Sequence, residues 1–335
     1  MAFTYIPKDP HDILEEEMHA RTFSRVLIFL CLCICGGLVL YKLFVLPPAA
    51  FPVETTIVVE KGETLKDISR KLESAKVISS HTAFETIVIY GGKDRAILPG
   101  EYKFTHPLSV FGVAERFIGG VFGISKIKIT IPEGYTRIQM ASLFAQKFPN
   151  VSKDTFLQMT EGKEGYLFPD TYFFFPSVTT EVVVQTLSDT FTKKTETLFV
   201  EARERGMPIS TLVTLASIVE REANGKEDRG IIAGILWNRL NQGILLQVDA
   251  PFVFLLGKES KNLTRDDLAI DSPYNTYKYK GLPPTPIASP GLDALRATLS
   301  PTPNTYLFYL HGQDGAVYYA HTFAEHIKNK KNYLR

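Results

Sequence analysis

Cysteine is scarce in this chain of 335 residues: the sequence holds only Cys31, Cys33 and Cys35, and all three lie inside one apolar run. No cysteine follows between Gly36 and Arg335, which excludes a structural disulfide and a thiolate metal site from this part of the chain. The seven histidines also lack the HExxH spacing of zinc peptidases. We therefore expect no metal site and no metal catalysis.

The chain also lacks an excess of positive or negative side chains. Lys and Arg number 37 against 36 Asp and Glu, so the composition argues against a nucleic-acid partner. Hydrophobic residues make up 45% of the chain and charged residues 22%, as is usual for folded proteins. The length allows two or three domains, each with its own core.

A long apolar run is present at residues 26–46, and it is long enough to cross a bilayer as one helix. Arg21 and Arg25 flank one end, and Lys42 can reach the interface at the other end. These charges predict a cytoplasmic tail over residues 1–25, with the rest of the chain outside the plasma (inner) membrane. A cleaved signal peptide is the competing interpretation, but no clear small-x-small cleavage site follows the run.

Two similar stretches follow a proline-rich linker at residues 47–55. Each has a β-rich start, an acidic residue close to a glycine, and a threonine two residues after that glycine. Gly62 and Gly134 can form the turns, and Thr64 and Thr136 can cap the helices that follow. The stretches read VVEKGETLKDISRKL (Val58–Leu72) and TIPEGYTRIQMASLF (Thr130–Phe144).

This repeated pattern resembles the LysM module, a small βααβ unit that binds N-acetylglucosamine in glycan strands. We interpret residues 56–148 as a LysM-like α+β domain. Two possibilities stay open: the unit binds sugar, or the two βα stretches only support the fold.

The remaining residues, 149–335, predict a second α+β domain. Helical patterns cover residues 178–205, 211–223 and 229–242, and Ser289-Pro290 predicts the start of another helix. Two short β-rich segments at residues 306–310 and 317–320, joined through Asp314-Gly315, predict a closing hairpin.

Glu220 is the first ionisable residue after the uncharged run Ile209–Val219. On a helix it shares a small, apolar side with Ala216 and Val213. Burial against such a surface would raise the pKa of its carboxyl group, as a general acid near neutral pH requires. The pattern alone favours the simpler interpretation that Glu220 is the polar end of a buried helix.

Several long motifs in one order resemble the endolytic murein transglycosylases of the MltG, or YceG-like, family. The resemblance covers nearly the whole chain beyond the N-terminal tail. The motifs are EGYLFPDTY (Glu164–Tyr172), LASIVEREA (Leu215–Ala223), GIIAGILWNRL (Gly230–Leu240), LQVDAPF (Leu246–Phe252), SPYNTYKYKGLPPTPIASPG (Ser272–Gly291) and AHTFAEH (Ala320–His326).

The resemblance implies that Glu220 is the essential glutamate, because it is the first acidic residue after the ASIV stretch. It also implies substrate-binding roles for Gln247, Asp249, Tyr274, Asn275 and Thr276, with Gln247 and Asn275 as donors and Asp249 in electrostatic support. The family usually has Gln-x-Asp-Pro here, whereas one alanine separates the aspartate from the proline in this chain. The two tyrosines of the Tyr-Asn-Thr-Tyr stretch could equally pack a loop.

The implied reaction cleaves the bond between N-acetylmuramic acid and N-acetylglucosamine inside peptidoglycan strands and leaves 1,6-anhydro ends, without cofactor. The resemblance further implies a partnership with peptidoglycan synthases. Two alternatives are a membrane-anchored peptidoglycan-binding scaffold without activity and a lysozyme-like hydrolase.

Overall fold

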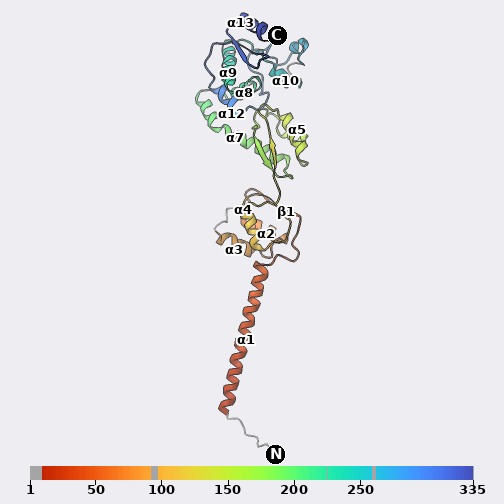
Figure 1. Cartoon of the computed structure of the whole chain (residues 1–335), viewed down its shortest axis with the longest axis vertical. Helices are drawn as coiled ribbons and strands as arrows, with labels where there is room; N and C mark the ends of the chain where they lie inside the picture. Colours follow the sequence, from red (N-terminus) through yellow and green to blue (C-terminus); the bar gives the residue numbers. More distant parts are fainter. Residues whose placement is uncertain (1–9, 92–96, 224, 259–261, 335) are drawn as a thin grey trace, which may run out of the picture. The chain divides into compact units, whose positions relative to one another are not determined.

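The computed structural model describes residues 10–91, 97–223, 225–258 and 262–334, and it divides into two compact units, Met1–Ser125 and Lys126–Arg335. Both units combine helices with antiparallel two-stranded sheets (Figure 1), which confirms the predicted α+β class.

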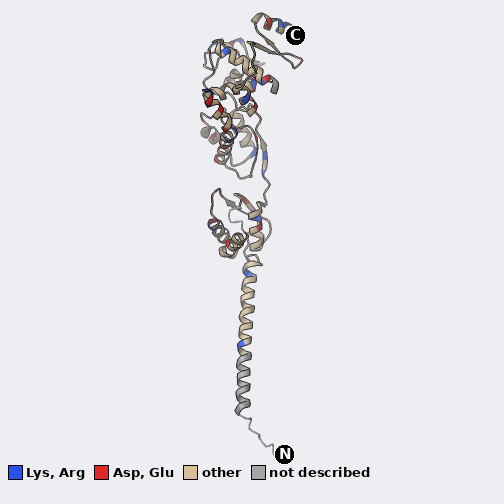
Figure 2. Cartoon of the chain, turned by 90° about the vertical axis from the view of Figure 1, so that its left-hand side faces the viewer, with Lys and Arg blue, Asp and Glu red and all other residues tan. Residues whose placement is uncertain are grey.

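The first unit begins with helix α1 (Pro10–Phe44). Its segment Ser24–Lys42 is long and apolar enough to cross a membrane, with Arg25 and Lys42 near its two ends (Figure 2). The helix ends two residues before the predicted limit at residue 46. Pro47 and Pro48 follow, and a residue that precedes proline disfavours the helical conformation.

A βααβ unit follows α1. Strands β1 and β2 pair antiparallel from Thr55↔Phe104 to Val59↔Gly100, and two helices connect them before a final helix closes the unit. These elements are β1 (Thr55–Val59), α2 (Leu65–Ser74), α3 (His81–Tyr90), β2 (Gly100–Phe104) and α4 (Val110–Gly119).

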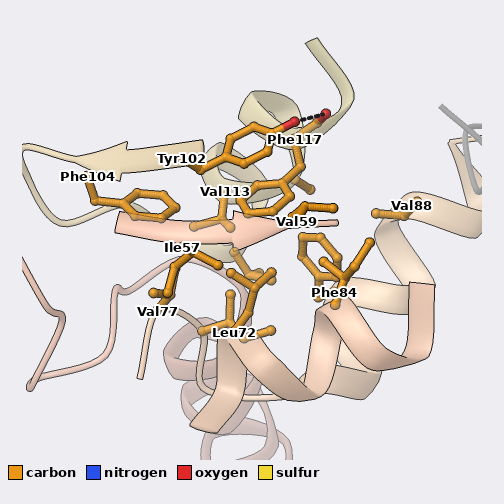
Figure 3. Packing of buried hydrophobic residues seen from close by; sticks show 14 of the residues in the cluster. Ile57, Val59, Leu72, Val77, Phe84, Val88, Tyr102, Phe104, Val113 and Phe117 are labelled. Carbon is orange, nitrogen blue, oxygen red and sulfur yellow. Dashed lines mark hydrogen bonds between the residues drawn. The ribbon is translucent and has the colours of Figure 1, made fainter. Parts of the chain in front are cut away.

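The core of this unit lies between the sheet and the three helices (Figure 3). The rings of Tyr102 and Phe117 stack with their centroids 3.9 Å apart, and Leu72, Phe84 and Phe104 are fully buried beside them. The Tyr102 hydroxyl donates to the Leu98 carbonyl oxygen at 2.6 Å, so burial of this polar group leaves no unpaired donor.

The second unit opens with another βααβ arrangement. Strand β3 (Ile127–Thr130) pairs antiparallel with β4 (Thr171–Phe174), and helices α5 (Arg137–Lys147) and α6 (Lys153–Met159) connect them. The predicted repeat is therefore present, and each copy extends over two strands and two helices.

Local interactions explain why both repeats begin alike. Thr64 and Thr136 cap α2 and α5, as the sequence predicts, and each belongs to a reciprocal capping box with the residue three positions later. Gly62 and Gly134 have φ angles of 92° and 76°, in the left-handed region that glycine adopts readily. The same turn-and-cap chemistry thus starts both helices.

The structural division after Ser125 differs from the boundary predicted at 148/149. The reason is that β3 and α5 share a core with later elements: Phe144 contacts the rings of Phe148, Phe156 and Phe174. The second repeat is therefore part of the second unit.

The rest of the second unit is mostly helical. The predicted helices and the closing hairpin are all present, with bounds shifted by a few residues. The elements are α7 (Thr180–Glu204), α8 (Ile209–Glu222), α9 (Lys226–Asn241), α10 (Ala250–Leu256), α11 (Arg265–Ala269), α12 (Leu292–Leu299), β5 (Phe308–His311), β6 (Val317–Ala320) and α13 (Phe323–Tyr333).

A buried glutamate in the second repeat makes stability depend on pH. Glu164 is 6% exposed, and its carboxylate accepts from the backbone N–H of Arg137 at 3.1 Å, at the first turn of α5. Burial raises its pKa from 4.5 to about 7. Because the folded state holds this proton more tightly, the stabilising contribution is fully present below pH 4.5 and is lost as the pH rises through 7.

We therefore expect Glu164→Gln to gain stability relative to the wild type as the pH rises from 4.5 to 8, by about 3 kcal/mol in total. Urea unfolding at several pH values measures this difference. Glu161→Gln, an exposed glutamate nearby, is the matched control and should show no such trend. A pH-independent difference for Glu164→Gln would contradict the prediction.

Candidate active site

Helix α8 is the central element of the candidate site. Its residues from Leu212 to Val219 are all buried, and it packs against α7, α9, α10 and α12. Ser217 accepts a hydrogen bond from the backbone N–H of Ile287 at 3.0 Å, which fixes the segment before α12 against α8. Glu220 lies on the last turn of this buried helix, and its side chain is only 4% exposed.

Among the residues that the structure describes, the Glu220 carboxylate has two hydrogen-bond partners, which come from different elements. Arg229, on α9, donates from Nη2 to Oε1 at 2.7 Å, and the backbone N–H of Gly291 donates to Oε2 at 3.0 Å. Gly291 is the N-cap of α12, where the helix dipole favours a negative charge. The sequence predicted a carboxyl group against an apolar surface. The structure instead shows a carboxylate that is buried and ion-paired.

The turn of the second repeat that contains Glu133 and Gly134 packs against the segment just before α12, beside Glu220. Gly134 donates its N–H to the Ser289 carbonyl oxygen, and Ser289 donates its own N–H to the Tyr135 carbonyl oxygen, both at 2.9 Å. Because the Ser289 backbone is paired with this turn, the N-cap of α12 is Gly291 and not the predicted cap, Ser289. The pairing brings Glu133 next to Gly291.

Gly291 packs closely against the Glu133 side chain. A Cβ atom there would lie 1.8 Å from Oε1 of Glu133, which is far inside van der Waals contact. Glu133 Oε2 also lies 3.4 Å from Nη2 of Arg229. Arg229 therefore contacts two carboxylates, one buried (Glu220) and one 46% exposed (Glu133).

The charges in this cluster act on each other. Burial and the nearby charge of Glu220 both raise the pKa of Glu133, while Arg229 lowers it. Nε of Arg229 is buried and has no hydrogen-bond partner among the described residues. The side chains that could exchange protons or contact a polar ligand thus come from the second repeat, α8 and α9.

The loop before α10 carries the predicted residues Gln247 and Asp249. Gln247 has a φ of 52°, unusual for a residue other than glycine, and its Oε1 accepts from Arg239 at 3.2 Å. Asp249 is the N-cap of α10, and it accepts from the Tyr277 hydroxyl at 2.8 Å. Both residues line a cavity of ≈ 620 Å³, as do Tyr277 and Arg221.

The three other predicted residues make structural contacts, and Thr276 is the one that contacts this loop. Thr276 exchanges hydrogen bonds with the backbone of Val248, at 2.9 Å to the carbonyl oxygen and 3.1 Å from the N–H. Asn275 is fully buried, and it donates to the carbonyl oxygens of Leu268 and Ile270. Both amide hydrogens of Asn275 are thereby used, so the geometry gives it a structural role in place of the predicted donor role.

Tyr274 also has mainly packing contacts. Its hydroxyl forms a 2.7 Å hydrogen bond with Thr285, and its ring lies 5.6 Å from that of Phe254. This agrees with the alternative of a loop packed by aromatic residues. The departure from the family pattern is accommodated locally, because Pro251 lies in the first turn of α10, where proline is tolerated.

Glu222 is a second carboxyl group on α8, and it lines the same cavity. Burial raises its pKa, and the Tyr309 hydroxyl donates to its Oε2 at 2.7 Å. A second cavity, of ≈ 370 Å³, is lined by Thr136, Gln139 and again Arg221. Arg221 contributes to both, so hollows lie on two sides of the C-terminal end of α8.

Sequence reasoning missed Glu133, Arg229 and Glu222. A signal for Glu133 is present in the sequence, because an acidic residue close to a glycine occurs in both repeats, but the pattern favours a sugar-binding domain and not a catalytic site. Arg229 had no distinguishing signal, because its pairing with Glu220 depends on the packing of α9 against α8. Glu222 resembled a common polar helix end.

Comparison with known proteins decides the family. The model of the YceG-like family matches residues 57–332. This chain belongs to the YceG-like family. The match includes both βααβ repeats, α8 with Glu220, and the loops that carry Gln247 and Asp249.

Two curated relatives are similar to most of this chain. An endolytic murein transglycosylase of Bacillus subtilis is 31% identical over 330 residues, covering 90% of this chain and 91% of the relative. One of Streptococcus pneumoniae is 29% identical over 362 residues, and the match covers 93% of this chain but only 65% of that protein. A putative yceG-like protein of Listeria monocytogenes, solved as a crystal structure, is 29% identical with a TM-score of 0.56, covering 82% of this chain and 98% of that one.

Proposed function

We propose that this chain is an endolytic lytic transglycosylase that cleaves the N-acetylmuramic acid–N-acetylglucosamine bond within peptidoglycan strands. One observation supports Glu220 as its catalytic residue. This carboxyl group lies at the end of a buried helix, within hydrogen-bond distance of a guanidinium and a helix N-terminus, and its neighbour Arg221 lines two cavities. The named activity of the curated relatives supports the reaction class.

In the proposed mechanism, protonated Glu220 gives its proton to the glycosidic oxygen as the bond to the anomeric carbon of N-acetylmuramic acid breaks. The N-acetylglucosamine part leaves with a new hydroxyl group. The resulting carboxylate is stabilised by Arg229 and by the Gly291 N–H. It then accepts the proton of the muramyl C6 hydroxyl, whose oxygen closes the 1,6-anhydro ring. The cycle consumes no water, and Glu220 is protonated again.

We assign substrate binding to the cavity beside α8. Its volume of ≈ 620 Å³ is in the range of saccharide-sized ligand sites. Gln247 and Asp249 line it with polar groups, and the Asp249 carboxylate can assist the developing positive charge electrostatically. Thr276 acts indirectly, because it holds the loop that presents these two residues, and Asn275 fixes the neighbouring segment at Leu268 and Ile270.

The first unit has a proposed role in holding the glycan strand. Its β1-α2-α3-β2 order is the order of a LysM module, which supports a LysM-like unit that binds N-acetylglucosamine. Helix α1 would anchor the enzyme in the plasma membrane with the N-terminus in the cytoplasm. The anchor would restrict the enzyme to strands near the membrane surface, where peptidoglycan synthases are the expected partners.

A digest of purified, uncrosslinked glycan strands tests the reaction. Transglycosylation leaves 1,6-anhydro ends, whereas a lysozyme-like hydrolase leaves reducing ends that are heavier by one water molecule. We expect mass spectrometry to show anhydro products from internal cleavage. Reducing ends would identify a hydrolase, and strand binding without cleavage would identify a scaffold.

A further inference from the structure

We infer that Glu133 is a positioning residue of the cleavage reaction: it receives Arg229 when Glu220 is protonated and has to release that arginine. The inference rests on the proposed function, in which Glu220 alternates between acid and base. The second repeat would then take part in catalysis, in addition to any role in binding sugar.

The first step is the distance between the two carboxylates. Nη2 of Arg229 lies 2.7 Å from Glu220 Oε1 and 3.4 Å from Glu133 Oε2. These two oxygens therefore lie no more than about 6 Å apart, which is close enough for their charges to influence each other's protonation. Both carboxyl groups also border Gly291, whose N–H binds Glu220 and whose Cα lies against Glu133.

The second step is charge balance. The guanidinium of Arg229 lies 2.7 Å from the Glu220 carboxylate, whereas a general acid must start with its proton in place. When Glu220 takes up a proton, Arg229, whose side chain is 17% exposed, would lose its buried anionic partner. Glu133 is already 3.4 Å from the same nitrogen and can take over the pairing with little movement.

The third step is access. Glu220 is 4% exposed and Glu133 is 46% exposed, so Arg229 lies between a covered carboxyl group and one that faces solvent. A shift of Arg229 toward Glu133 uncovers the Oε1 side of Glu220, from which a glycosidic oxygen could be protonated. Other charged groups near this cluster are Arg221, beside Gly134, and Asp293, whose charge acts on Glu133.

The test is the pH dependence of strand cleavage by the full-length enzyme with Glu133→Gln. The variant removes the charge that receives Arg229 and keeps the ion pair between Arg229 and Glu220. We expect the basic limb of the kcat profile to move to lower pH by about one unit, because a nearby negative charge that favours protonation is lost. kcat near neutral pH should fall about 10-fold, with KM changed by less than about 3-fold.

Matched variants separate this role from a structural one. Glu201→Gln removes a glutamate of similar exposure (48%) that also pairs with an arginine, and it should leave the profile unchanged. Glu133→Asp keeps the charge and should restore most of the profile. The melting temperature of Glu133→Gln should stay within about 3 °C of the wild type, because the side chain is half exposed.

A double-mutant cycle with Arg229→Gln tests the route through the arginine. The effects of the two variants on kcat should be non-additive, because both groups act on Glu220 through one contact. An unchanged pH profile for Glu133→Gln, or additive effects in the cycle, would overturn the inference. An active Glu220→Gln variant would instead overturn the proposed function, so the two failures are distinguishable.

Discussion

Replacement of Glu220 by glutamine is expected to reduce the release of anhydro-muropeptides from glycan strands by about 100- to 10,000-fold. Glutamine keeps the size of the side chain and can still accept from the Gly291 N–H, but it cannot donate and recover a proton. The loss should therefore appear in kcat, while strand binding and the melting temperature change little. Single-turnover digestion with mass detection measures the release, and strand pull-down measures the binding.

Two comparisons make this result specific. Glu201→Gln, an exposed glutamate of α7 that pairs with Arg205, should retain wild-type release. Glu222→Gln tests the other carboxyl group of α8, which is half-buried and hydrogen-bonded to Tyr309. If Glu222→Gln abolished release while Glu220→Gln retained it, the acid would be Glu222 and the proposed assignment would be wrong.

Replacement of Phe144 by alanine is expected to destabilise the second unit by about 3–5 kcal/mol. Phe144 is fully buried on α5, and its ring lies 5.8 to 6.1 Å from those of Phe148, Phe156 and Phe174. Truncation removes apolar burial and leaves a cavity among rings that cannot all close in. Urea unfolding of the detergent-solubilised chain measures the loss.

The control is a phenylalanine of the same repeat that faces solvent. Phe173, on β4, is 58% exposed, so Phe173→Ala should cost less than about 1 kcal/mol. Equal losses for the two variants would mean that the core of the second repeat does not stabilise this unit. A large loss for Phe144→Ala should also reduce activity, because β3 and α5 hold the turn that carries Glu133.

Local signals in the sequence predicted much of the fold. Thr64 and Thr136 cap helices because a threonine after a tight turn satisfies free backbone N–H groups, and such chemistry depends on only a few neighbouring residues. The buried helix that carries Glu220 was likewise predictable, because a long uncharged and mostly apolar run is usually buried when a chain folds.

Contacts between distant segments were not predictable from such signals. The Arg229–Glu220 pair depends on how α8 and α9 pack, and the Gly134–Ser289 pairing joins segments more than a hundred residues apart. Asn275 shows the opposite problem. A motif match indicated a substrate donor, but its two amide hydrogens are used by the carbonyl groups of Leu268 and Ile270.

Because the second repeat belongs to the second unit, the choice of fragment boundary matters for experiments on the isolated catalytic part. A fragment that starts at residue 149 would lack β3, so β4 would present an unpaired edge prone to aggregation. It would also lack Glu133 and the turn that covers Glu220. The shortest fragment that folds by itself and cleaves glycan strands should therefore begin near Lys126, where the two units divide.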